Sequence, residues 1–123
     1  MPANHVLCVE DDEDTRDMLK TRLGLSGFEA VVAPDTGAAL RLMERERFSL
    51  YVVDGGLRGA GGPSLCEQIR VSDAHTPIII FSGHALASDI ETGMRAGANA
   101  YLVKPDSSEL IPTISRLLQA AAW

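Results

Sequence analysis

Cysteine and long hydrophobic runs are both scarce in this chain. Cys8 and Cys66 are its only cysteines, and they lie far apart with no CxxC pattern. Each stands in an apolar-periodic segment, so we expect two buried, reduced thiols rather than a disulfide or a redox pair. No apolar run approaches the roughly 18 residues that a membrane-spanning helix needs, and the first residues lack the basic and apolar regions of a signal peptide. The sequence therefore predicts a cytoplasmic chain with no membrane partner.

Basic residues are also few. The chain has 11 lysines and arginines against 17 acidic residues, and its formal net charge is −6. The basic residues are scattered, whereas a nucleic-acid surface needs them clustered, so no direct nucleic-acid partner is expected. With 46% hydrophobic and 23% charged residues, the composition is that of an ordinary globular chain and argues against disorder. A length of 123 residues fits one domain over 1–123, with a core over about 5–120.

Strand-like and helix-like patterns alternate five times along the chain. Short apolar runs predict strands at 6–9, 29–33, 50–53, 77–81 and 100–103. Apolar residues at helical spacing predict a first helix that Asp14 caps and that Gly24 and Gly27 end. Further helices are predicted at 36–47, 63–71 and 85–95, and a last one is capped by Ser107 or Ser108. Such alternation predicts an α/β fold with a doubly wound parallel sheet, whose ligand site lies at the carboxyl ends of the strands.

Reactive side chains follow four of the five predicted strands. The first strand runs into the acids Glu10, Asp11 and Asp12. The remaining reactive residues end the third, fourth and fifth strands and are Asp54, Ser82 and Lys104. Because parallel strands end at the same edge of a sheet, we expect these side chains to lie close together.

Carboxylates gathered at one edge need positive charge to offset their repulsion. Mg²⁺ takes oxygen ligands and is usually bound through one or two carboxylates. Glu10, Asp11 and Asp54 carry three negative charges, which Mg²⁺ and Lys104 together would balance. Taken singly, acids before a helix can serve only its N-terminus, a lysine can be a surface charge, and a serine after a strand can be a cap. Their occurrence together favours a metal-dependent phosphate site.

Four segments around these residues resemble the receiver domains of two-component response regulators. They are Val6-Leu-Cys-Val-Glu-Asp-Asp, Leu50-Tyr-Val-Val-Asp54, Pro77-Ile-Ile-Ile-Phe-Ser82-Gly and Gly97-Ala-Asn-Ala-Tyr-Leu-Val-Lys104-Pro105. Gly62, eight residues after Asp54, also matches, and the resemblance covers essentially the whole chain. It implies a flavodoxin-like (βα)5 fold with strand order 2-1-3-4-5 and a cis peptide bond between Lys104 and Pro105.

The resemblance implies a phosphorylation site with a bound metal. Asp54 would be the phosphoacceptor, which takes a phosphoryl group from a phosphohistidine. Mg²⁺, for which Mn²⁺ can substitute, would be held by Asp11, by Asp54 and by the backbone carbonyl of Gly56. Glu10 would hold a metal-bound water. The chain would not be a classical enzyme, but it would catalyse its own aspartyl phosphorylation and dephosphorylation.

By the same resemblance, Lys104 and Ser82 would contact the phosphoryl oxygens, and Ser82 and Tyr101 would form a switch. In the family, the hydroxyl moves to the phosphate and the aromatic ring turns inward, which remodels the face of helix four, strand five and helix five. Alternatively, Tyr101 is a half-buried tyrosine with its hydroxyl in water. The implied partners are a sensor histidine kinase or histidine phosphotransfer protein and a downstream effector. The implied oligomeric state is a monomer or a weak phosphorylation-dependent dimer.

The chain departs from the family pattern after its third and fourth strands. Arg58 stands where the family usually has a proline, and five glycines surround it, so we expect a mobile loop. Ser82-Gly83 replaces the more frequent Thr-Ala, which predicts a more loosely coupled switch. We expect Gly56 to leave open the path of the water that hydrolyses the acyl phosphate, and His84 to modulate it. Alternatively, His84 is a solvent-facing residue at a helix start.

Other functions of the same fold fit less well. Binding of a flavin phosphate needs a Ser-, Thr- or Gly-rich loop after the first strand, where this chain has Glu-Asp-Asp-Glu-Asp. A phosphatase that forms an aspartyl phosphate typically has a second Asp two residues after its nucleophile, and here that residue is Gly56. The main alternative is a receiver-like protein-interaction module that works without phosphorylation.

Overall fold

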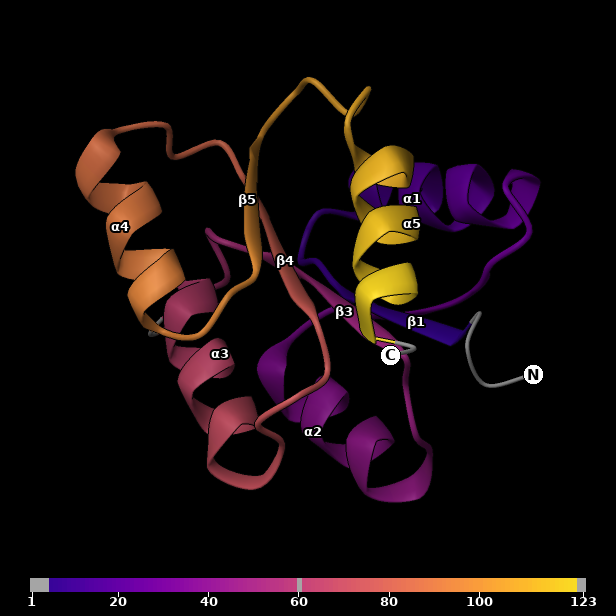
Figure 1. The fold of residues 1–123 in the computed structure, drawn as a ribbon, viewed down its shortest axis with the longest axis horizontal. Helices are drawn as coiled ribbons and strands as arrows, with labels where there is room; N and C mark the ends of the chain where they lie inside the picture. The colour runs from indigo at the N-terminus through magenta and orange to yellow at the C-terminus, as the bar shows by residue number, and fades with distance from the viewer. Residues whose placement is uncertain (1–4, 60, 122–123) are drawn as a thin grey trace.

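The computed structural model describes residues 5–59 and 61–121, so residues 1–4, 60 and 122–123 of the predicted domain lie outside the described residues. Its strands are β1 (His5–Val9), β2 (Glu29–Ala33), β3 (Leu50–Asp54), β4 (Ile78–Ser82) and β5 (Ala100–Val103). They form one parallel five-stranded sheet in the order β2-β1-β3-β4-β5 (Figure 1). The predicted doubly wound, flavodoxin-like fold is therefore confirmed.

Helices cover both faces of the sheet. They are α1 (Glu13–Leu25), α2 (Thr36–Arg45), α3 (Gly61–Ser72), α4 (Ala87–Arg95) and α5 (Leu110–Ala121). The helices α1 and α5 pack on one face, and α2, α3 and the end of α4 pack on the other (Figure 1). Among the described residues, no helix is long and apolar enough to cross a membrane.

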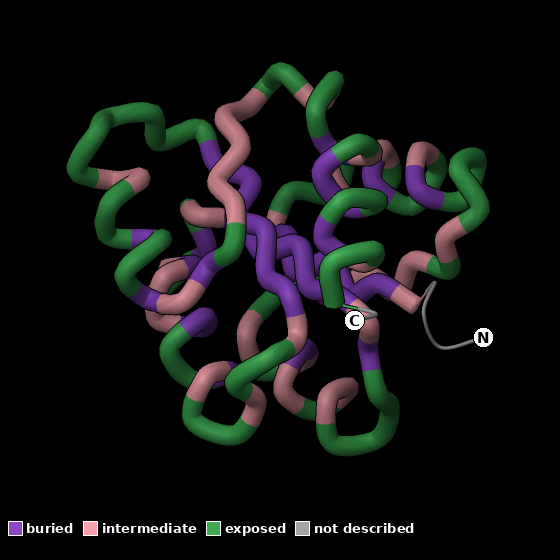
Figure 2. The backbone as a smooth tube through the Cα atoms, viewed as in Figure 1, coloured by how far each residue is buried: buried purple, intermediate pink, exposed green. Residues whose placement is uncertain are grey.

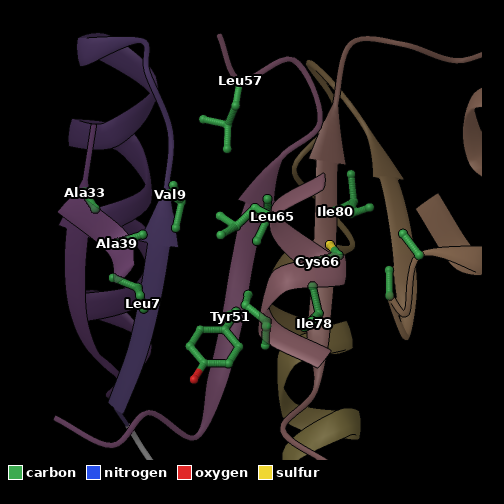
Figure 3. Close-up of a cluster of buried hydrophobic side chains, with 14 of the residues drawn as sticks. Leu7, Val9, Ala33, Ala39, Tyr51, Leu57, Leu65, Cys66, Ile78 and Ile80 are labelled. Atoms are coloured by element: carbon green, nitrogen blue, oxygen red, sulfur yellow. The ribbon is translucent and has the colours of Figure 1, made fainter. Parts of the chain in front are cut away.

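The central strands are buried because both of their faces are covered. In β1, Leu7 and Val9 join the cluster beneath α2 and α3, whereas Val6 and Cys8 join the cluster beneath α1 and α5. Figure 2 shows buried strands at the centre of the molecule and exposed residues on the outer helical faces and loops. Figure 3 shows the α2–α3 side of this core, where side chains of α3 pack against β3 and β4. Strands of this kind need apolar residues without alternation, which is the pattern that predicted them.

Both cysteines are buried free thiols, as expected from the sequence. Cys8 lies in the cluster with α1 and α5, and Cys66 lies in the cluster on the opposite face. Burial raises the pKa of the Cys8 thiol to about 12 and that of Cys66 to about 11. Neither thiol is therefore ionised near neutral pH, which makes both unreactive.

The predicted cap of the first helix is wrong, because capping depends on which side chain reaches the free N–H groups. Asp12 rather than Asp14 caps α1, since its Oδ2 accepts a hydrogen bond from Thr15 N–H at 2.9 Å. The last helix begins only at Leu110. The Ser107 hydroxyl, one of its two predicted caps, instead accepts a hydrogen bond from the guanidinium of Arg22.

The other boundaries shift by one or two residues. Helix α2 ends at Arg45 rather than at residue 47, because the backbone of Glu46 is extended, with φ −136° and ψ 153°. Helix α3 begins at Gly61 instead of Pro63, and α4 begins at Ala87 instead of residue 85. Strands β3 and β4 each run one residue further than predicted, so the two reactive residues expected beyond them end the strands themselves.

Candidate functional site

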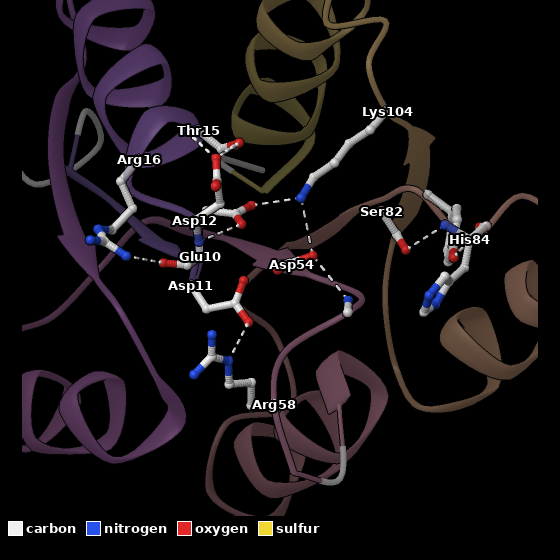
Figure 4. Close-up of polar contacts among 12 residues, drawn as sticks. Glu10, Asp11, Asp12, Thr15, Arg16, Asp54, Arg58, Ser82, His84 and Lys104 are labelled. Carbon is white, nitrogen blue, oxygen red and sulfur yellow. Dashed lines mark hydrogen bonds and ion pairs between the residues drawn. The ribbon is translucent and has the colours of Figure 1, made fainter.

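The carboxyl edge of the sheet carries the predicted reactive side chains. Asp54 is the last residue of β3, and Ser82 is the last residue of β4. Glu10 directly follows β1, and Lys104 directly follows β5. Figure 4 shows Glu10, Asp11, Asp54 and Lys104 converging at this edge. The parallel topology thus brings together residues that are up to 94 positions apart in the chain.

Lys104 links the two most buried carboxylates of the site. Its Nζ donates hydrogen bonds to Glu10 Oε1 at 2.8 Å and to Asp54 Oδ1 at 3.1 Å. Asp54 Oδ1 also accepts a hydrogen bond from Gly56 N–H at 2.9 Å, and Glu10 Oε2 accepts one from Asp12 N–H at 3.1 Å. Glu10 is only 1% exposed and Asp54 only 5%, so these charge-assisted bonds replace most of the lost hydration.

Three carboxylates form an acidic trio, defined here as Glu10, Asp11 and Asp54. One carboxylate oxygen of each lies within 4.8 Å of those of the other two. Hard divalent cations such as Mg²⁺ prefer oxygen ligands of this kind, so the donor set fits the predicted ion. Asp12, the other acid that follows β1, turns its carboxylate to the start of α1 instead.

Burial and the ammonium group have opposing effects on the pKa values of this cluster. Burial raises the pKa of Glu10 even though Lys104 and Asp12 N–H bond to it. Burial acts in the same direction on Asp54, but the Gly56 N–H and Lys104 outweigh it and lower the pKa of Asp54 below its usual value of 3.8. Burial would lower the pKa of Lys104, but the carboxylates of Glu10 and Asp54 raise it. Asp54 is therefore ionised near neutral pH beside a charged lysine.

The loop after β3 passes very close to the sheet. A β-carbon at Gly55 would lie 2.5 Å from the Ser82 side chain, and one at Gly62 would lie 2.4 Å from the carbonyl oxygen of Asp54. Gly59 and Gly61 have φ angles of +87° and +85°, which side chains strongly disfavour. Leu57 is 4% exposed and anchors the loop in the core. Glycine is therefore needed at these positions for close packing or for the backbone conformation. The prediction of a mobile loop did not consider these needs.

Ser82, His84 and Tyr101 are joined by hydrogen bonds at the start of the β4–α4 loop. Ser82 is fully buried, and its Oγ accepts a hydrogen bond from His84 N–H at 3.0 Å. Tyr101 is half-buried, and its hydroxyl donates to the backbone carbonyl of His84 at 2.7 Å in an exposed position. The His84 ring is on the Gly56 side, since a β-carbon at Gly56 would lie 3.9 Å from His84 Cε1. The Lys104–Pro105 peptide bond is cis, as the resemblance implies.

Two contacts of the site were not predicted. Arg16 Nη1 donates a hydrogen bond to the backbone carbonyl of Glu10 at 3.0 Å, and Arg58 Nε lies 3.9 Å from Asp11 Oδ2. Arg58 carried a sequence signal, because it replaces a proline that the family usually has. No pattern distinguished Arg16 from the other scattered basic residues.

Comparison with known proteins agrees with this fold and identifies the family. Residues 6–115 match the family model of the response regulator receiver domain. The transcriptional regulatory protein CseB of Streptomyces coelicolor is 34% identical over 116 residues, which are 94% of this chain and 49% of CseB. The chain thus spans about half the length of this curated relative.

Solved structures give the same result. A CheY-like receiver domain protein from Methanospirillum hungatei superposes with a TM-score of 0.90 at 28% identity, covering 97% of this chain and 96% of that one. The response regulator TrrA of Thermotoga maritima, solved in complex with Mg²⁺ and BeF, has a TM-score of 0.83 at 26% identity, covering 93% of this chain and 98% of that one. The chain therefore belongs to the response regulator receiver domain family.

Proposed function

We propose that Asp54 accepts a phosphoryl group from a phosphohistidine of a sensor kinase or histidine phosphotransfer protein. The observation that carries the proposal is the environment of its carboxylate. It is nearly buried and ionised, and its Oδ1 is held between Lys104 Nζ and Gly56 N–H. A positioned, desolvated carboxylate beside fixed positive charge is suited to phosphoryl transfer, in which positioning and charge neutralisation supply most of the catalysis.

In the proposed step, an Asp54 oxygen attacks phosphorus. The O–P bond forms while the N–P bond breaks, and the electron pair of that bond returns to the donor histidine. Lys104 Nζ, which contacts Asp54 Oδ1 at 3.1 Å, would bind one phosphoryl oxygen. The Ser82 hydroxyl would donate to another after it turns toward the acceptor. Donors placed in this way stabilise the negative charge on the phosphoryl oxygens in the transition state.

A divalent cation is part of the proposed site. Mg²⁺ bound by Asp11, Asp54 and the Gly56 carbonyl, with a water held by Glu10, would neutralise the charge that phosphate brings to the trio. The oxygen donor set of the acidic trio supports this assignment. The structural relative TrrA, solved with Mg²⁺ and BeF, supports it independently.

The proposed switch uses Ser82 and Tyr101. Both side chains form hydrogen bonds with the backbone of His84. A movement of the Ser82 hydroxyl toward phosphate would break its hydrogen bond with His84 N–H. This would change the conformation of the loop whose carbonyl accepts from the Tyr101 hydroxyl. The readout surface would be the face formed by α4, β5 and α5, where a downstream effector would bind. Family membership supports this kind of coupling.

Intact-mass measurement after incubation with acetyl phosphate and Mg²⁺ tests the proposal. We expect one added phosphoryl group on the wild-type chain and none on Asp54→Asn. An adduct that survives in Asp54→Asn would place the acceptor elsewhere. Absence of an adduct with acetyl phosphate and with a phosphohistidine donor would favour an interaction module that works without phosphorylation.

A further inference from the structure

Every carboxylate of the acidic trio already has a cation of the chain beside it. Lys104 Nζ bonds to Glu10 and Asp54, whereas Arg58 Nε lies 3.9 Å from Asp11 Oδ2. Figure 4 shows the two cations on different sides of the trio, with the Arg58 guanidinium reaching Asp11 from the β3–α3 loop. The carboxylate that Arg58 contacts is the one proposed to bind metal directly.

The two cations are held with different strength. The Lys104 side chain is 23% exposed and makes hydrogen bonds of 2.8 and 3.1 Å. The Arg58 side chain is 94% exposed, and its single contact is longer. Exposed ion pairs are weak and are screened by salt, whereas partly buried pairs are screened much less. A divalent cation can therefore displace Arg58 from Asp11 at small cost, while Lys104 stays in place for the phosphoryl group.

The backbone keeps Arg58 near Asp11 in spite of the exposure of its side chain. The preceding residue, Leu57, is 4% exposed, and the following residue, Gly59, turns the chain with a φ of +87°. Arg58 and Asp11 also line the same hollow of about 300 Å³ between the β1–α1, β2–α2 and β3–α3 loops. The guanidinium thus has a high local concentration at this carboxylate, as a tethered ligand does.

We propose that Arg58 is a tethered competitor of the divalent cation for Asp11 and lowers the metal affinity of the site. The inference rests on the proposed metal site and adds a residue that tunes it. Arg58 acts only through Asp11 and does not touch the reacting atoms, so it changes how tightly the metal binds without taking part in phosphoryl transfer. Because the contact is exposed, its effect on affinity should be a few-fold rather than many-fold.

A Mg²⁺ titration followed by ¹H–¹⁵N NMR at the Gly56 amide measures the effect without any phosphorylation. Arg58→Ala should bind Mg²⁺ about two- to fivefold more tightly than wild type at low ionic strength. The difference should shrink at about 1 M salt, since screening weakens the competing pair. Arg58→Lys keeps the charge and should stay near wild type. Arg45→Ala removes the same charge at the far end of α2 and should have no effect.

The outcomes separate the two proposals. If wild type shows no saturable Mg²⁺ binding, the proposed metal site fails and the inference fails with it. If wild type binds Mg²⁺ but Arg58→Ala binds no more tightly than Arg45→Ala, only the role of Arg58 is overturned. In an Asp11→Asn background the Arg58→Ala change should no longer alter the remaining affinity. A persistent gain there would show that Arg58 acts through general charge and would also overturn the competition with Asp11.

Discussion

At the scale of single residues, the site depends on how one ammonium group serves two carboxylates. Glu10 and Asp54 are almost fully buried, and without a partner the charge of either would strongly destabilise the folded chain. Lys104 compensates both, and its aliphatic stem brings Nζ to 5.6 Å from the centre of the Phe81 ring. The same geometry that keeps Asp54 ionised therefore also stabilises the folded chain.

Lys104→Met should lower both phosphorylation and stability. Methionine keeps an unbranched side chain over Phe81 but leaves Glu10 and Asp54 without their cation, so we expect a loss of about 1–3 kcal/mol in the free energy of unfolding near neutral pH. Urea denaturation measures the stability, and intact mass after treatment with acetyl phosphate measures the adduct.

Lys20→Met is the matched control, because Lys20 is exposed on α1 and is the only other lysine. It should leave both measurements within error of wild type. The Lys104→Met deficit should also shrink in acid, where the two carboxylates take up protons. Equal stability of the two lysine variants would contradict the proposed dual role of Lys104.

His84→Ala should shorten the lifetime of the acyl phosphate. The His84 ring stands beside the Gly56 position, where a β-carbon would be 3.9 Å from Cε1 and 3.6 Å from Asp54 Oδ1, so we expect the ring to cover one approach to Asp54. Removing the ring opens this approach to water, and we expect about two- to tenfold faster hydrolysis. His84→Phe keeps the bulk and should hydrolyse at nearly the wild-type rate. Decay of the phosphorylated mass measures both, and equal lifetimes of all three proteins would contradict the screening role.

At the scale of elements, the β3–α3 loop fits against the sheet by means of missing side chains. Gly62 is buried at the start of α3, directly against the backbone of Asp54 and Gly55. A β-carbon there would be 2.4 Å from Asp54 O and 2.8 Å from Gly55 Cα, and neither atom can move without moving the end of β3. Helix α3 can approach Asp54 this closely only because residue 62 has no side chain.

Gly62→Ala should therefore destabilise the chain by about 1–3 kcal/mol, the usual cost of overpacking, and should slow phosphorylation by shifting Asp54. Gly24→Ala is the control, because Gly24 lies within α1 and its β-carbon would meet nothing within 4 Å. That change should stabilise slightly, since alanine favours helix over glycine. Thermal unfolding and the rate of phosphorylation report both effects, and a Gly62→Ala variant as stable as wild type would show that the loop can yield.

The sequence predicted strands better than helix ends, and the physical reason is clear in particular residues. Val52 and Val53 are buried whatever their exact contacts, because a two-sided strand needs only apolar bulk. Helix caps instead depend on one hydrogen bond among competing acids, and Asp12 reaches Thr15 N–H where Asp14 does not. Strand topology also placed Glu10, Asp54 and Lys104 at one edge. The contacts of Arg58 and Tyr101 could not be predicted, since they depend on the paths of two loops.

At the scale of the whole molecule, the shifted pKa values determine how stability depends on pH. Asp73 is partly exposed, and burial acts to raise its pKa, but the Thr76 side chain and the N–H groups of Thr76 and His75 lower it below 3.8. The pKa of Asp54 is lowered as well. An acid with a lowered folded pKa stabilises the protein above its unfolded pKa, and this stabilisation is lost as pH falls through the folded value. Glu10, whose pKa is raised, has the opposite effect and gains stability on protonation.

The expected result is a stability that does not fall between neutral pH and about pH 5, because the aspartates stay ionised there and protonation of Glu10 favours the folded state. It should then fall below about pH 4, where the aspartates take up protons. Asp73→Asn keeps the oxygen that accepts from Thr76 N–H but removes the charge, so it should flatten part of this acid decline while folding normally near neutral pH. Urea denaturation of both proteins across this range measures the difference. Asp54 keeps its lowered pKa in the Asp73→Asn variant, so part of the loss of stability in acid must persist. If the free energy of unfolding fell identically in the two proteins below about pH 4, Asp73 would contribute nothing to the pH dependence.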